Sequence, residues 1–163
     1  MNIKNVIGDY EQFLQKIFYN LKNVGIDLND LKELDHIAYR TEDLKTYNKT
    51  KRQLIPFCEK YNDKEFNGRR IFVCRFKEPL EYEDFRIEGL ELLAPKMDNK
   101  FTNGLEHAEF VLSCTLEELL KKHPDIIFNM SAYNREENPE LIIDFEDCAV
   151  KFHKVSLLHT RNL

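Results

Sequence analysis

The sequence predicts an α+β protein in which two tandem βαβββ modules form an incomplete mixed β-barrel with an open cleft, preceded by N-terminal helices. Three observations carry this prediction: a helical apolar period near the N-terminus, alternating strand patterns beyond it, and one order of elements that occurs twice. The chain has 163 residues, 42% of them hydrophobic, which is enough for one shared core. We expect a helical segment at 1–34 and modules at 35–96 and 104–158, the two modules forming one domain.

The N-terminal segment has the pattern of an amphipathic helix that covers another surface. Its apolar residues recur at helical intervals from Val6 to Leu21, and Gly25 is a natural stop. A short helical stretch is expected from Leu28 to Leu34.

The first module begins with a strand, His36 to Arg40, in which His36, Ala38 and Arg40 share one face. Thr41 or Asp43 is a plausible N-cap for the helix that follows, and Asn67-Gly68 has the composition of a hairpin turn. The elements expected after the first strand are a helix from Leu44 to about Lys60 and strands at Arg70–Lys77 and Phe85–Leu93, with a short strand before the turn.

The second module repeats this order. Its helix begins at Thr115, with Glu118 at the capping-box position, and ends near Lys122. The expected strands are Glu106–Ser113, one around Ile126–Met130, Glu140–Phe145 and Ala149–Leu157. Such a repeat places equivalent residues of both halves around one centre, with the helices on the convex side and a cleft on the concave side.

Charge and composition exclude several classes of function. The formal net charge of −5 is spread along the chain, whereas nucleic-acid binding needs a concentrated cationic face. No apolar stretch is long enough to span a bilayer, and the acidic N-terminal segment does not have the pattern of a signal peptide. We therefore expect a cytoplasmic protein that binds a small-molecule substrate, with no nucleic-acid or membrane partner, as a monomer or a homodimer.

Two histidines occupy equivalent places, because His36 opens the first strand of one module and His107 that of the other. Glu91 lies among leucines in the last strand of the first module, where a buried carboxylate needs a cation. His153, in the last strand of the second module, is a possible fourth group. Two imidazoles and a carboxylate suit Fe(II), Mn(II), Ni(II) or Zn(II). In the alternative, Glu91 pairs with Arg40 in a metal-free network.

Several motifs together resemble the YecM family, which is similar to the vicinal oxygen chelate superfamily of glyoxalase I, ring-cleaving dioxygenases and bleomycin-resistance proteins. They are DHIxxR at 35–40, NGRxI at 67–71, EP at 78–79, LEL before Pro95, GxEHxExVL at 104–112, NPxL at 138–141 and KFHxxS at 151–156. The resemblance implies paired βαβββ modules around a metal. Its ligands would be His36, Glu91, His107 and, at the fourth place, Lys151 or His153.

These observations lead to one hypothesis and two rivals. In the first, a metal-dependent isomerase, lyase or oxygenase-like enzyme binds two oxygens of a small substrate, and Glu109 acts as the base. Arg40, Arg69 and Lys151 would bind that substrate, the arginines through a carboxylate or phosphate. In the second, the same cleft only binds a small ligand. In the third, the modules are a scaffold whose helix at residues 6–21 exposes an apolar stripe to a partner.

Overall fold

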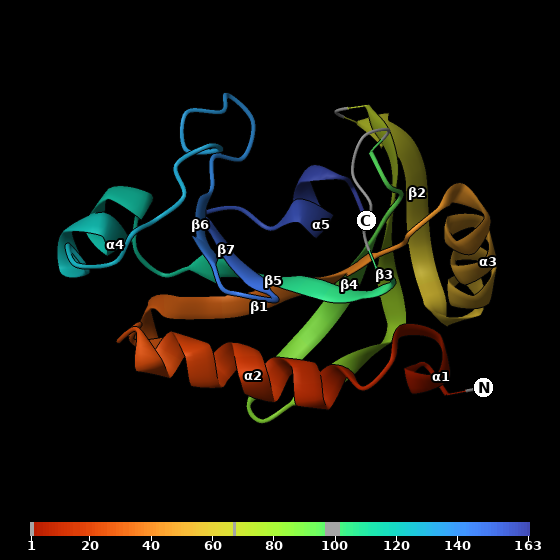
Figure 1. Cartoon of the computed structure of the whole chain (residues 1–163), viewed down its shortest axis with the longest axis horizontal. Coiled ribbons are helices and arrows are strands. Elements are labelled where there is room, and N and C mark those ends of the chain that lie inside the picture. The colour runs from red at the N-terminus through yellow and green to blue at the C-terminus, as the bar shows by residue number, and fades with distance from the viewer. Residues whose placement is uncertain (1, 67, 97–101) are drawn as a thin grey trace.

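The fold of the chain is built on one curved sheet of seven strands, and the computed structural model describes residues 2–66, 68–96 and 102–163. The strand order is β2-β3-β4-β1-β5-β7-β6, and the sheet is mixed and not closed into a barrel (Figure 1). The strands are β1 (Leu31–Arg40), β2 (Cys58–Phe66), β3 (Arg69–Tyr82), β4 (Phe85–Leu93), β5 (Gly104–Leu112), β6 (Leu141–Asp144) and β7 (Ala149–His153). The α-helices are α1 (Lys4–Ile7), α2 (Tyr10–Asn23), α3 (Leu44–Leu54), α4 (Leu116–Lys122) and α5 (Leu157–Thr160). The predicted fold class is confirmed.

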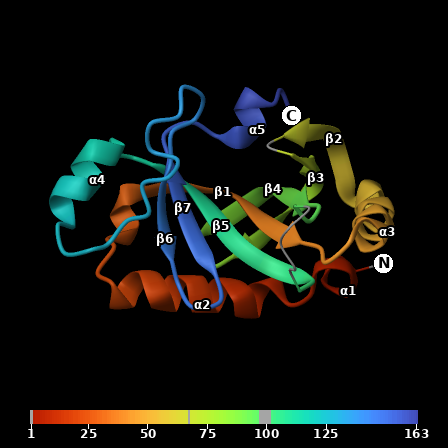
Figure 2. The same ribbon diagram turned by 45° about the horizontal axis from the view of Figure 1, so that its top comes forward.

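The two halves of the chain meet at the antiparallel pair β1 and β5, in the middle of the sheet. Each of these strands has a parallel neighbour from its own half, β4 beside β1 and β7 beside β5. Seen from the tilted direction, the sheet bends away on both sides of the central pair (Figure 2). The site described below lies on this central pair.

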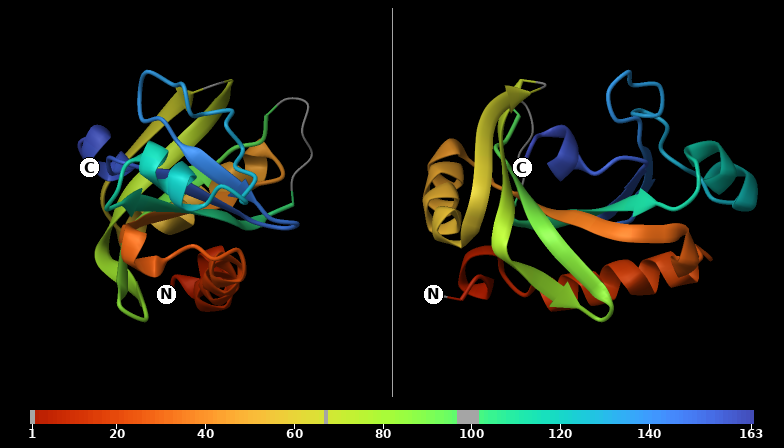
Figure 3. Two further views of the ribbon diagram at one scale, coloured as in Figure 1. Left: turned by 90° about the vertical axis from the view of Figure 1, so that its left-hand side faces the viewer. Right: turned by 180° about the vertical axis from the view of Figure 1, so that it is seen from behind.

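The N-terminal helix is interrupted near its start. Gly8 has a positive φ of 84°, which favours glycine, and the Asp9 side chain then caps α2 by accepting hydrogen bonds from the Glu11 and Gln12 amides. The apolar face of α2 is buried, and Phe18 packs edge-on against Phe110 of β5, with ring centroids 5.8 Å apart. The helix therefore covers the convex side of the sheet, as the view from behind shows (Figure 3).

The C-terminal helix α5 lies on the opposite side of the sheet from α2, within its curve (Figures 1 and 3). Leu158 is 1% exposed and packs in a small apolar cluster with Ala38, Ile71, Val73 and Leu93. Its side chain sits directly over Gly89 of β4, where an added Cβ would lie 2.7 Å from Leu158 Cδ2. Gly89 therefore makes the close approach of α5 possible.

Four sequence-based assignments of secondary structure are wrong. Helix α3 ends at Leu54 and not near Lys60, because Pro56 has no amide hydrogen to donate and ends the helix in a 3-10 turn, Ile55–Phe57. The predicted helix over 28–34 is a 3-10 turn of three residues, after which β1 begins at Leu31. The strand expected around Ile126–Met130 is a single bridge between Asn129 and Ile142, and the last strand ends at His153, before α5.

The predicted turn residue Asn67 lies outside the described residues, although β2 and β3 pair up to Phe66 and Arg69 on either side of it. Among the described residues, no helix is both long and apolar enough to cross a membrane.

Candidate metal centre

The central strand pair brings the two predicted histidines together. In the antiparallel register His36 lies opposite Glu109, and Ala38 lies opposite His107. Because successive side chains of a strand alternate between faces, these residues all project to the concave side. His36 is 0% exposed and His107 is 1% exposed, so both imidazoles lie beneath the surface.

Four side chains converge at this point: His36, Glu91, His107 and Glu109 each offer one ligand atom, and these atoms all lie within 4.8 Å of one another. Glu109 Oε1 is 3.0 Å from His107 Nε2 and 3.5 Å from His36 Nε2. Glu91 Oε2 is 3.7 Å from His107 Nε2. All four residues are buried.

The strand register explains how the two halves contribute. Glu91 of β4 lies beside Ala38 of β1, and Lys151 of β7 lies in the equivalent place beside Glu109 of β5. Lys151 is thus the counterpart of Glu91 in the second half, while Glu109 is the counterpart of Ala38. The second carboxylate of the cluster therefore comes from the first strand of its module, and a lysine stands in the last strand.

The cluster has the composition and spacing that a divalent ion requires. Ligand bonds to a first-row ion are about 2.0–2.2 Å long, so opposite ligand atoms are about 4.0–4.4 Å apart, close to the observed span. His36 Nε2 is buried and makes no hydrogen bond to any described residue. Two carboxylates would balance the charge of the ion, and a set of two imidazoles and two carboxylates suits Fe(II), Mn(II), Ni(II) or Zn(II).

Each histidine is held by the acid that precedes it in the chain. His36 Nδ1 lies 2.9 Å from Asp35 Oδ2, and His107 Nδ1 lies against Glu106 Oε2. Since a carboxylate can only accept, both Nδ1 atoms are donors, and both Nε2 atoms face the cluster. Asp35 also accepts hydrogen bonds from Ser156 Oγ and from the Leu157 amide, which ties His36 to the start of α5.

The two acids that accept hydrogen bonds from the histidines, Asp35 and Glu106, have lowered pKa values. Burial alone would raise the pKa of Glu106, but the hydrogen bond to His107 and the charges of His107 and Arg40 lower it to about 2. For Asp35, burial is likewise outweighed by the hydrogen bonds of His36 and Ser156, and its pKa is lowered. Both carboxylates therefore keep the acceptor role that fixes the histidine rings.

Glu109 and Lys151 form a buried ion pair beside the cluster, with Lys151 Nζ 2.7 Å from Glu109 Oε1. Burial opposes the charge on Glu109, but Lys151 and His36 together hold its pKa well below the usual range. Burial also opposes the charge on Lys151, and the negative charges of Glu109, Glu91 and Glu140 raise its pKa above the ordinary value. The pair is charged at neutral pH.

The predicted fourth ligand, His153, lies next to this group rather than within it. Its Nε2 is 3.5 Å from Glu109 Oε2 and 3.9 Å from Asp35 Oδ2, and its Nδ1 lies 2.7 Å from the Val155 carbonyl oxygen. The structure brings His36, Glu91 and His107 together and joins Glu109, which the sequence suggested as a base, to the same cluster.

A cleft of about 670 Å³ opens above the cluster. Glu91, Glu109 and Lys151 line it, as does Arg69 from the start of β3. Glu140 also lines it and is 7% exposed, and burial together with the charge of Glu109 raises its pKa. Glu140 was not among the predicted site residues: the sequence placed it at the start of a strand, Glu140–Phe145, and its pattern does not show that this end of the strand lies beside the cleft.

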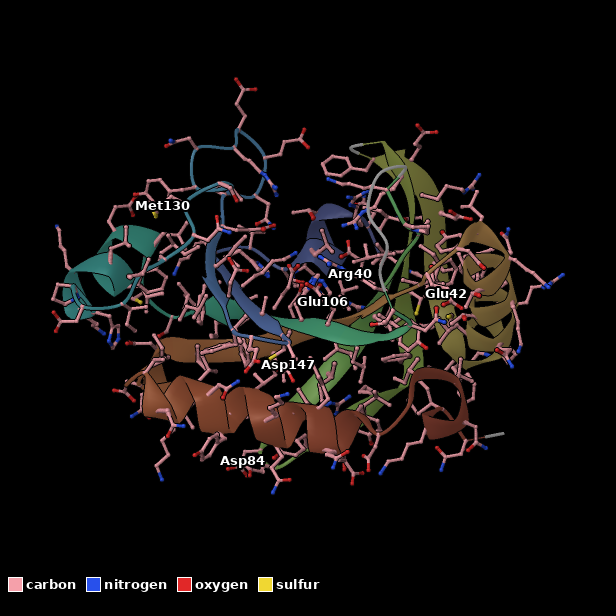
Figure 4. All side chains as sticks on the ribbon, viewed as in Figure 1. Arg40, Glu42, Asp84, Glu106, Met130 and Asp147 are labelled. Carbon is pink, nitrogen blue, oxygen red and sulfur yellow. The ribbon has the colours of Figure 1, made fainter. Side chains whose placement is uncertain are left out.

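Arg40 occupies a different place from Arg69. Its guanidinium pairs with Glu106 at 2.9 Å, and the two labelled side chains lie close together near the centre of Figure 4. Arg40 lines a smaller hollow of about 360 Å³, which Asp144 and Asp147 also line, and it is not among the residues that line the larger cleft. Its described contact is with the acid that holds His107.

A comparison with family models decides the affiliation of the chain. The model described as YecM protein matches residues 2–138. The chain belongs to the YecM family. Protein YecM of Escherichia coli is 23% identical over 170 residues, which cover 95% of this chain and 90% of that protein. An uncharacterized protein of Haemophilus influenzae is 27% identical over 111 residues, or 68% of this chain, and the match spans only 58% of that relative's length.

Solved structures agree on the fold. A structural-genomics protein, EC4020, superposes with a TM-score of 0.78 at 23% identity, covering 96% of this chain and 90% of that one. A methylmalonyl-CoA epimerase in complex with methylmalonyl-CoA superposes with a TM-score of 0.51 at 16% identity, covering 76% and 94%. The epimerase is a member of the vicinal oxygen chelate superfamily, so this YecM-family chain has the glyoxalase-like fold.

Proposed function

We propose that the protein is a divalent-metal-dependent enzyme of the vicinal oxygen chelate type that acts on a small oxygen-bearing substrate. The observation that carries the proposal is the convergence of His36, Glu91, His107 and Glu109, from both halves of the chain, beneath an open cleft. The scaffold alternative predicts that His36, Glu91 and His107 do not converge, and an exposed apolar stripe on the N-terminal helix would favour it. Neither condition holds, since the apolar face of α2 is buried.

When bound, the ion would act as a Lewis acid that stabilises negative charge on a substrate oxygen. His36, Glu91, His107 and Glu109 would hold it. Lys151 keeps Glu109 ionised and places a positive charge at the floor of the cleft, where it can also bind an oxygen of the substrate. Asp35 and Glu106 keep both imidazoles in one orientation.

A proton acceptor must line the cleft without being committed to the cluster. Glu109 contacts His107, Lys151, His36 and His153, which suits a ligand. Glu140 lines the same cleft, and its carboxylate has a looser contact, 3.5 Å from Arg135 Nη1. We therefore assign proton transfer to Glu140, with Glu109 as the base only if the ion is held by His36, Glu91 and His107 alone.

The reaction class follows from this arrangement by analogy with the fold. A Lewis acid beside a carboxylate base suits removal of a proton next to a carbonyl, as in isomerases and lyases. The open cleft above the cluster would also leave room for oxygenase-like chemistry.

Metal content tests the centre. Protein purified without an affinity tag and loaded with Zn(II) or Ni(II) should retain about one ion per chain after removal of free metal. His36→Gln and His107→Gln should each retain less than about a tenth of that amount, because each removes a nitrogen ligand. His123→Gln, at the C-terminal end of α4, is the matched control and should retain the metal. Folded protein that never binds the ion, or full metal in both variants, would contradict the proposal.

Proton exchange separates an enzyme from a binding module. Metal-loaded protein is incubated in heavy water with a panel of 2-oxo acids, 2-hydroxy acids and thioesters, and NMR follows the protons next to the carbonyl. Catalysed exchange that Glu140→Gln abolishes without loss of metal identifies Glu140 as the base. Exchange that only Glu109→Gln abolishes, again with the metal retained, assigns the base to Glu109. Binding of a panel member without exchange supports the non-catalytic alternative.

A further inference from the structure

The wall of the cleft above the cluster is rich in cations, among them Arg69, Arg135, Lys151 and Arg161. Two of these already have a carboxylate partner, since Lys151 pairs with Glu109 at 2.7 Å and Arg135 lies 3.5 Å from Glu140. Arg69 has none: its Nε is buried and makes no hydrogen bond to any residue that the structure describes. The structure thus distinguishes Arg69 from Arg40 and Lys151, the other substrate-binding residues that the sequence suggested.

The strand register places Arg69 on the same face of the sheet as the four-residue cluster. Every second side chain of β3 lies on the same face, so this face carries Arg69, Ile71 and Val73. Val73 lies beside Glu91 in the register with β4. Ile71 and Arg69 both line the cleft. Burial lowers the pKa of Arg69, and the charge of Glu91 acts against that shift. A guanidinium keeps its proton at neutral pH, so a half-buried one without a partner is unfavourable until an anion binds.

A second cation approaches the same corner from the C-terminal end. Phe66 of β2 is the register partner of Arg69, so the two side chains lie on the same face of the hairpin. The Arg161 guanidinium lies over the Phe66 ring, 5.5 Å from its centroid, and Arg161 follows directly after α5. Arg161 therefore stands at the rim of the cleft beside Arg69.

We propose that the substrate has two anionic ends: an oxygen pair that binds at the metal, and a second carboxylate or phosphate that Arg69 binds, with Arg161 at the rim. This inference rests on the proposed function, because it assigns the far end of the same substrate. Charge supports it. A divalent ion balances Glu91 and Glu109, and the lysines and arginines of the lining outnumber its two other carboxylates, Glu137 and Glu140, which leaves a net positive charge for the ligand. A planar guanidinium also matches a carboxylate or phosphate with two hydrogen bonds.

A matched pair of probes isolates the far end. 2-Oxoglutarate and 2-oxopentanoate have the same chain length and the same chelating oxygen pair, but the first ends in a carboxylate and the second in a methyl group. Titration calorimetry on the metal-loaded protein should show at least about tenfold tighter binding of the dicarboxylate, as expected for a charge-assisted contact. 2-Oxoadipate, one carbon longer, measures the reach of the anchor.

Variants assign the preference to one residue. Arg69→Met should bind both probes with affinities within about twofold of each other, and Arg69→Lys should keep part of the preference, because it keeps the charge and loses the paired geometry. Arg70→Met is the control: it changes the next residue, on the outer face, where the guanidinium pairs with Asp63 at 3.0 Å. This variant should discriminate like the unaltered protein. Unfolding curves of all three establish that they are folded.

Equal affinities for the acid and methyl probes in the unaltered protein would overturn the inference, as would a preference that survives in Arg69→Met. Failure of both dicarboxylates to bind would overturn it too, while stoichiometric metal in the same sample would leave the proposed centre standing. If the protein binds no metal, the proposed function fails by itself. The comparison of dicarboxylate and methyl probes on the metal-free protein then still tests the role of Arg69.

Discussion

Asp35→Asn tests whether Asp35 orients His36 for metal binding, because it alters the residue that holds His36 and leaves His36 itself unchanged. Asp35 is 0% exposed, and its Oδ2 accepts hydrogen bonds from His36 Nδ1 and from the Leu157 amide, each at 2.9 Å. Its Oδ1 accepts one from Ser156 Oγ. An asparagine has nearly the same shape and can place its one oxygen where Oδ2 lies, so the contacts persist without the charge.

The magnitude follows from the difference between charged and neutral hydrogen bonds. A hydrogen bond to a charged group contributes about 1.5–3 kcal/mol and a neutral one about 0.5–1.5 kcal/mol, so the two contacts at Oδ2 lose about 2 kcal/mol together. The smaller cost of burying a neutral amide offsets part of this. We expect the free energy of unfolding of the metal-free protein to fall by about 1–3 kcal/mol. The affinity of His36 for metal should fall as well, and loss of such a partner weakens metal binding by about 10–100-fold.

Urea unfolding measures the first quantity, and competition with a calibrated chelator for Zn(II) measures the second. Ser156→Ala is the matched control, because it removes a hydrogen bond to Asp35 without touching His36. It should lower the free energy of unfolding by about 1.5–3 kcal/mol, because it removes a hydrogen bond to a charged group and the N-cap of α5, and leave the metal affinity within about threefold. A folded Asp35→Asn protein with unchanged metal affinity would refute the positioning role and leave Asp35 a purely structural residue.

Three further predictions concern stability. Gly89→Ala should lower the free energy of unfolding by about 1–3 kcal/mol, because the new Cβ would lie 2.7 Å from Leu158 Cδ2. If that contact is the cause, the same substitution should destabilise the Leu158→Ala protein by less. Asp63→Asn should cost about 1–2 kcal/mol at pH 7, since burial raises the pKa of Asp63 but the hydrogen bonds of Arg70, Lys51 and Tyr47 outweigh it and lower that pKa. This contribution is full above the unfolded pKa of about 3.9 and is lost as the pH falls through the lower folded value. Urea midpoints of the two proteins that stay apart in acid would count against it. Thr115→Ala should cost about 1 kcal/mol by removing the cap of α4, and an unchanged unfolding midpoint would exclude that contribution.

The sequence predicted most of the fold because the repeat gave two independent observations of most elements, although it also suggested a strand around Ile126–Met130, where the structure has a single bridge. The strand at Phe85–Leu93 and the capping box at Thr115 were predicted at the positions where the structure has them. Errors arose where local patterns carry no information. Strand β2 buries only Cys58 along its length, so it lacks the alternation of a half-buried strand, and its first residues were assigned to the preceding helix.

The candidate site was foreseen in part for the same reason. His36, Glu91 and His107 follow from alternation and from the repeat, and the structure places them together. The place of Glu109 depends on the register between β1 and β5, which sets it opposite His36, and no single strand reveals that register. Asp35 and Glu106 could have been noticed, because an acid directly precedes each histidine.

Anomalous diffraction from crystals of the metal-loaded protein, recorded on both sides of the absorption edge of the ion, would locate the ion relative to the four side chains. We expect one strong peak about 2.0–2.2 Å from His36 Nε2 and His107 Nε2 and from a carboxylate oxygen of Glu91 and of Glu109. A map with no peak between these four side chains would rule out the metal centre.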